Sequence, residues 1–212
     1  MGMSDVAMTF DDLDDQPLSA LAPKERILKT ASALFGRLSI HTVGIDRIIA
    51  ESGVAKMTFY KHFPSKANLI ATYLRQKNDM WLEMLSAATD APSLSPPERV
   101  LAVFDVLGGS FGTPSFRGCP FVKGMAEFGP DANSPEIQSI ISSYFDSLHN
   151  LVASLVGPLG LIDPEKTVVQ ILSLVQGSIV MAQATSNPAI AAANREAAGL
   201  LLEVGRKASL HP

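Results

Sequence analysis

Residues 45–66 read IDRIIAESGVAKMTFYKHFPSK, and this stretch decides the fold. Its first part has isoleucines at helical spacing and is followed by Gly53, a residue that readily adopts the left-handed conformation that ends a helix. Its second part stops at Pro64, because proline disfavours helical geometry at the residue before it. We therefore predict two short helices, over 45–52 and 56–62, joined by a tight turn.

The second of these helices has two chemically different faces. Phe59 and Phe63 are four residues apart and are expected to face inward. The outer positions carry hydrogen-bond donors, as in a helix-turn-helix that enters the DNA major groove. Each of these residue types is also common on a solvated helix surface, so the prediction depends on their combination. The predicted base-reading residues are Lys56, Met57 and Thr58, the predicted phosphate contacts are Tyr60, Lys61, His62 and Lys66, and Gly44 at the start of the preceding helix completes the predicted DNA-binding set.

Charge is distributed unevenly along the chain. The net charge is -4, yet residues 23–78 contain ten Lys or Arg and only three Asp or Glu. Such asymmetry indicates a basic, DNA-facing module joined to an acidic body, although chance clustering on solvated helices would produce the same pattern. Residues 1–22 contain five aspartates and no basic residue, which predicts a flexible acidic tail.

The bulk composition limits the class of protein. The chain has 212 residues, 47% of them hydrophobic, and can bury a substantial core as one large or two small domains. A single cysteine, Cys119, excludes an intramolecular disulfide and suits a reducing compartment. We find neither a secretory signal nor about 18 consecutive apolar residues, so we expect a cytoplasmic protein with no membrane partner.

The remaining sequence has helical periodicity and no convincing strand alternation. We predict an all-α fold of about nine helices: a three-helix head with a larger helical body. The expected domains are the tail over 1–22, a helix-turn-helix domain over 23–67 and a ligand-binding and dimerisation domain over 68–212. The further helices are predicted over 24–38, 66–88, 97–110, 119–128, 134–156, 164–184 and 188–206.

The stretch GIDRIIAESGVAKMTFYKHFPSKANLI, residues 44–70, resembles the helix-turn-helix signature of the TetR family of bacterial transcription regulators. The resemblance covers about residues 24–75 and extends more weakly to 116–128 and 170–203. It implies an Ω-shaped homodimer whose body binds a small effector and dimerises through its last two helices. It also implies a repressor that leaves a palindromic operator when the effector binds. Three positions depart from the family pattern, namely Ser39, Gly44 and Ala55.

Aromatic residues and methionines gather in the predicted body, which indicates an apolar pocket for a hydrophobic effector of unknown identity. Such stripes are also typical of plain core. Polar groups near such a pocket are Tyr144, His149, Gln176 and Cys119, and a thiol of low pKa at Cys119 would be an oxidant sensor. The predicted pocket residues are Trp81, Met84, Phe104, Leu107, Phe111, Phe121, Met125, Tyr144, Phe145, Leu148, Val175 and Ile179.

The last two predicted helices alternate small and large apolar residues, which suits a four-helix interface across a two-fold axis. The alternative is that the same residues pack within their own subunit. The predicted interface residues are Val168, Ile171, Leu172, Val175, Ile179, Ala191, Ala198, Leu201 and Leu202.

Other functions have less support in the sequence. It lacks the common hydrolase, nucleotide-binding and zinc motifs, and its four histidines have no metal-ligand spacing, so we expect no enzyme, catalytic residue, metal or cofactor. A helical adaptor that uses the basic module for protein contacts is an alternative. An activator that acts without an effector is another.

Overall fold

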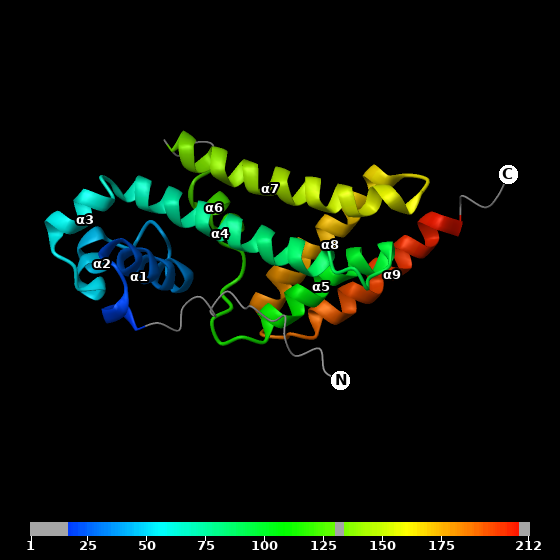
Figure 1. Cartoon of the computed structure of the whole chain (residues 1–212), viewed down its shortest axis with the longest axis horizontal. Coiled ribbons are helices and arrows are strands. Elements are labelled where there is room, and N and C mark those ends of the chain that lie inside the picture. Colours follow the sequence, from blue (N-terminus) through cyan, green and yellow to red (C-terminus); the bar gives the residue numbers. More distant parts are fainter. Residues whose placement is uncertain (1–16, 130–133, 208–212) are drawn as a thin grey trace. The chain divides into compact units, whose positions relative to one another are not determined.

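The computed structural model describes residues 17–129 and 134–207. These residues form nine α-helices, two short 3-10 helices and no strand, which confirms the predicted all-α fold. Figure 1 shows their order along the chain. The helices are α1 (Pro23–Arg37), α2 (Ile45–Ser52), α3 (Lys56–His62), α4 (Lys66–Thr89), α5 (Pro96–Phe111), α6 (Pro120–Glu127), α7 (Pro135–Val156), α8 (Pro164–Thr185) and α9 (Ile190–Lys207), with 3-10 helices η2 (Leu18–Ala20) and η3 (Gly157–Leu159).

The bounds of α2 and α3 are those predicted, because local stop signals set them. Gly53 follows α2 with φ of 64° and donates its backbone N–H to the carbonyl of Ile49. Phe63 leaves helical geometry directly before Pro64. The hydroxyl of Ser65 then accepts the backbone N–H of Asn68 at 3.1 Å and caps α4, as the sequence suggests.

The described residues divide into two compact units. One contains residues 17–80, 119–129 and 134–144, so α6 and the first part of α7 cluster with α1 to α3. The other contains residues 81–118 and 145–207. The predicted domain limits at 22 and 67 remain a prediction, because these units are defined by packing and the predicted domains were defined by function.

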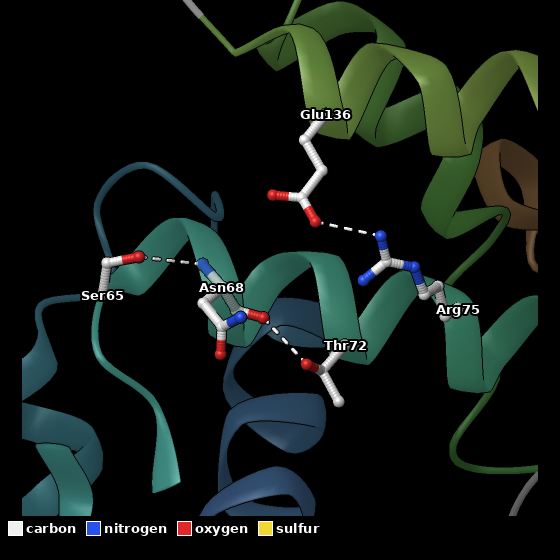
Figure 2. Close-up of polar contacts among 5 residues, drawn as sticks. All are labelled: Ser65, Asn68, Thr72, Arg75 and Glu136. Atoms are coloured by element: carbon white, nitrogen blue, oxygen red, sulfur yellow. Dashed lines mark hydrogen bonds and ion pairs between the residues drawn. The ribbon is translucent and has the colours of Figure 1, made fainter. Parts of the chain in front are cut away.

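In the first unit, α2 and α3 pack against α1. Phe35 on α1, Ile48 on α2 and Phe59 on α3 are each fully buried and form the centre of this small core. The amino-terminal part of α4 and the start of α7 are joined by a salt bridge between Arg75 and Glu136 at 2.9 Å (Figure 2).

In the second unit, α5, α8 and α9 pack against one another. The amide of Asn194 donates to the hydroxyl of Ser178 at 2.7 Å, and Arg195 pairs with Asp105 at 2.9 Å. By length and composition alone, α8 could cross a membrane. Within its unit α8 packs against α5 and α9, and a single helix of this length and composition is weak evidence for a membrane span.

The short helix η2 lies in the segment that we predicted to be flexible. It contacts α1, and Leu18 and Leu21 are half-buried there. Residues 18–20 thus form a short helix beside α1, and the predicted flexibility of the tail stays a prediction. The acidic part of the predicted tail, residues 1–16, lies outside the described residues.

Candidate nucleic-acid interface

Helix α3 separates apolar from exposed polar residues, as predicted. Phe59 has no exposed surface and contacts Phe63, with ring centroids 6.1 Å apart. On the outer face Met57 is 86% exposed and Tyr60 42% exposed. Among the described residues, the Met57 side chain is therefore largely open to solvent. Of the other predicted DNA contacts, Lys56 and Lys61 are exposed, and Thr58 and His62 are half-buried.

Acidic residues of α2 lie close to two of the basic groups. Asp46 lies 3.7 Å from the Nζ of Lys56, and Glu51 accepts the Nε–H of Arg47 at 2.7 Å. Both pairs are largely exposed, so they contribute little stability. The Asp46 carboxylate thus lies beside Lys56 at the start of α3, and the spacing of the two residues in the sequence did not predict this contact.

Gly44 precedes α2 in extended geometry, and no side chain caps the helix. The first backbone N–H groups of α2 therefore keep their capacity to donate, which is the usual way that a helix start holds a phosphate. Gly44 is exposed and lies directly before α2, as predicted. Because glycine has no side-chain hydroxyl, only backbone N–H groups can bind a phosphate at this helix start.

Lys66, a predicted phosphate contact, already makes a hydrogen bond within the chain. Its ammonium donates to the backbone carbonyl of His41 at 2.8 Å, and the residue is half-buried. Burial lowers the pKa of this lysine, and the nearby Glu127 partly offsets the shift. Lys66 thus holds the segment before α2 in place, in addition to any phosphate contact.

Two residues of α6, Lys123 and Glu127, make the densest set of hydrogen bonds around the helix-turn-helix. We call them the α6 pair. Lys123 donates to the carbonyls of Phe35, Gly36 and Leu38 at the end of α1. The carboxylate of Glu127 accepts from the segment that follows, residues 39–41: from the Ser39 hydroxyl and from the backbone N–H of Ile40 and His41, at 2.8, 3.0 and 2.8 Å.

The environment of Glu127 sets its pKa. Burial alone would raise the pKa of the carboxyl group, but the hydrogen bonds from residues 39–41 and the charge of Lys123 together lower it. The pKa of Lys123 is itself lowered by burial. Sequence reasoning missed this pair, since Glu and Lys at i and i+4 of a helix suggest only a surface ion pair.

The predicted pocket residues do not gather in one unit. Met125 is 53% exposed on α6, and Met84 and Phe145 are half-buried. The other nine are buried. Phe121, Met125 and Tyr144 belong to the unit that contains α1 to α3, and the remaining nine belong to the unit that contains α5, α8 and α9.

Within the first unit, Phe121 stacks on Tyr144 with ring centroids 3.7 Å apart. The Sγ of Cys119 lies 4.0 Å from the Tyr144 hydroxyl. Burial raises the pKa of the Cys119 thiol, which disfavours the reactive thiolate.

Most of the predicted interface residues pack within their own chain. Leu172 and Leu201 are half-buried, and the other seven are buried in the core. A side chain that is covered by its own subunit contributes little direct contact to a partner. The exposed apolar residues of α8 and α9 lie elsewhere on these helices and are Val169, Val180, Met181, Leu200 and Val204.

Comparison with known proteins agrees with this geometry. Residues 27–73 match the model of the tetR family of bacterial regulatory proteins. The crystal structure of SCO4454, a TetR-family transcriptional regulator from Streptomyces coelicolor, superposes with a TM-score of 0.79 and 28% identity, over 86% of this chain and 89% of that one. Residues 27–73 are therefore a TetR-family DNA-binding segment, and the chain has the fold of a TetR-family transcriptional regulator. TetR-family regulators bind DNA and form dimers. They are not enzymes, which confirms the prediction that this chain is no enzyme.

Curated relatives match about a third of this chain. The chain is 32% identical over 78 residues to the uncharacterised HTH-type regulator YerO of Bacillus subtilis, and 36% identical over 66 residues to RutR of Escherichia coli. These matches span 37% and 31% of this chain, and only 27% and 31% of the relatives. The reduced form of NemR from Escherichia coli, with 17% identity and a TM-score of 0.72 over 83% of this chain and 94% of that one, supports the fold alone.

Proposed function

We propose that this regulator is a cytoplasmic homodimeric repressor that binds a palindromic operator through α3 and is released by a small hydrophobic effector. The observation that carries the proposal is the exposed face of α3, where Met57 and Tyr60 are open to solvent while Phe59 anchors the helix. An apolar residue left exposed between basic and hydroxyl-bearing neighbours suits a groove lined with thymine methyls and phosphates.

The roles proposed for the individual side chains follow from their positions on the helix. Lys56, Met57 and Thr58 lie at the amino-terminal end of α3, which is the end that reads base edges in helix-turn-helix proteins. The phosphate contacts are proposed for Tyr60, Lys61 and the start of α2, with smaller contributions from the half-buried His62 and Lys66.

The dimer interface is proposed on the exposed faces of α8 and α9 rather than on their buried stripes. Val169, Val180 and Met181 are about half exposed or more on α8, and Leu200 and Val204 are more exposed on α9. Leu200 and Val204 are four residues apart and so share one face of the helix. A second copy of the chain would cover this apolar surface.

The effector site is proposed near the buried aromatic residues of α6 and α7 that lie within one unit, around Phe121 and Tyr144. These side chains are large and buried, and their surroundings suit an apolar molecule. By reciprocal linkage, an effector that weakens operator binding is itself bound less tightly in the presence of operator DNA.

Replacing Lys56 by alanine tests base reading. We expect the variant to lose roughly 1–3 kcal/mol of discrimination at one operator position and to keep its preference elsewhere. Competition between operator variants in a fluorescence-anisotropy titration measures this directly. If affinity and preference were both unchanged, the assignment of Lys56 would be wrong.

Replacing Tyr60 by phenylalanine is the companion variant, since it removes one hydroxyl from the same exposed face. We expect weaker binding to all DNA sequences by a similar factor, because a phosphate contact carries no sequence information.

A steep fall of affinity with salt in the wild type would exclude the adaptor alternative. Reporter expression that rises when the gene for this protein is deleted supports repression, and expression that falls supports activation.

A further inference from the structure

Helix α6 contacts the helix-turn-helix through the α6 pair, although it lies some 85 residues away in sequence. The two side chains bind opposite kinds of backbone group. Lys123 donates hydrogen bonds to backbone carbonyls at the carboxyl end of α1, and Glu127 accepts hydrogen bonds from the backbone N–H groups just beyond it. Cations favour the negative end of a helix, and a carboxylate suits unpaired N–H donors. One face of α6 thus holds both sides of the junction between α1 and α2.

The junction connects directly to the DNA-binding elements. His41 accepts Lys66 from the start of α4 through its carbonyl, and donates its N–H to Glu127. Its ring nitrogen lies 2.8 Å from the Glu127 backbone carbonyl, and its ring packs on Phe128 with centroids 4.6 Å apart. Two residues further on, Val43 is buried, and Gly44 directly precedes α2.

We propose that Glu127, supported by Lys123, is a positioning residue for DNA binding. It fixes residues 39–41 and, through His41 and Lys66, sets the relative positions of the starts of α2 and α4, on either side of α3. Glu127 touches no DNA in this scheme. The inference rests on the proposed DNA-binding role of α3, and it assigns α6 a part in the affinity of the head.

Replacing Glu127 by glutamine distinguishes two effects of this residue on DNA affinity, namely its positioning of residues 39–41 and the long-range repulsion between its charge and DNA. The substitution removes a negative charge, which by electrostatics alone would tighten binding to DNA. Positioning predicts the opposite sign: a roughly tenfold loss of affinity, corresponding to about one lost charge-assisted hydrogen bond. The loss is expected to be equal for operator and random DNA, because no base contact changes. Affinity equal to or above that of the wild type would overturn the proposal.

A control variant and a folding control accompany this measurement. Glu83→Gln makes the same charge change at an exposed position of α4, and we expect its affinity to be unchanged or slightly higher. A stoichiometric titration with excess DNA gives the active fraction, so partial unfolding of Glu127→Gln is distinguished from weaker binding by folded protein. Glu127→Asp keeps the charge and should recover part of the affinity.

Amide hydrogen exchange tests the positioning without DNA. The N–H groups of Ile40 and His41 are protected by the Glu127 carboxylate, so Glu127→Gln should exchange them faster while amides in the middle of α5 stay unchanged. Unchanged exchange at both positions would overturn the proposal even if DNA affinity fell. If the wild type bound no DNA, the proposed function would fail, and this exchange result would still decide whether Glu127 holds the segment.

The stability contribution of Glu127 depends on pH. Its folded-state pKa is lowered from the ordinary value of 4.5, so the carboxylate stabilises the fold fully above pH 4.5 and loses this effect as pH falls through the lowered value. We expect the difference in urea midpoint between wild type and Glu127→Gln to be constant near neutral pH and to close in acid. The other charged groups around the carboxylate, Lys123, Lys66 and His41, are the same in both proteins. A difference in urea midpoint that did not shrink as the pH fell below 4.5 would contradict the assignment.

Discussion

Replacing Phe59 by alanine is expected to destabilise the head by about 3–5 kcal/mol, the usual cost of removing a fully buried phenylalanine ring. The ring has no exposed surface and lies in edge contact with Tyr60 at 5.4 Å and beside Phe63. Because α3 has only seven residues, it cannot be stable by itself and depends on this anchor. Urea denaturation followed by circular dichroism measures the loss.

The control for this prediction lies two residues earlier on the same helix. Met57→Ala removes an exposed apolar side chain and should change stability by no more than about 0.5 kcal/mol. Met57→Ala should nevertheless alter operator binding, whereas Phe59→Ala should abolish binding through loss of the folded head. If Phe59→Ala were as stable as the wild type, the proposed inner face of α3 would be wrong.

Replacing Leu200 by glutamate is expected to convert the dimer to monomers. The side chain is 59% exposed in the single chain, and the proposed interface would bury the new charge without a partner. A monomer binds only one half-site, so operator affinity should fall by roughly 10²–10⁴-fold, the gain that joining two binding modules provides. Analytical ultracentrifugation gives the oligomeric state, and anisotropy titration gives the affinity.

A matched substitution distinguishes the interface from general surface effects. Met125 on α6 has a similar exposed fraction, 53%, and Met125→Glu introduces the same charge outside α8 and α9. We expect Met125→Glu to remain dimeric, and Val204→Glu, one turn from Leu200, to dissociate as Leu200→Glu does. If both α9 variants stayed dimeric, the interface would lie elsewhere.

The helix limits were predictable because they depend on neighbouring residues. Gly53, Pro64 and Ser65 each end or begin a helix by its own backbone geometry or hydrogen bond, and the bounds of α2 and α3 were correct to the residue. The inward position of Phe59 and Phe63 followed from their spacing. The exposure of Met57 followed in turn, since it lies on the other side of the same short helix.

Contacts between distant segments could not be read from the sequence. Glu127 and residues 39–41 are 86 to 88 positions apart, and no local pattern marks a carboxylate that will accept backbone N–H groups. On α8 and α9, periodicity identified the apolar residues without showing which neighbour covers them. Val175 and Ala198, which were predicted at a dimer interface, are buried within the single chain, and their place at an interface stays a prediction.

Selection of bound sequences from a random DNA pool at physiological salt tests most directly the claim that α3 reads DNA. For a dimer, we expect a palindromic site whose half-sites lie about one helical turn, roughly 34–36 Å, apart. Protein that is refolded free of ligand should give the same site, and Lys56→Ala should relax one position within each half. No enriched sequence from folded, ligand-free protein would contradict the account.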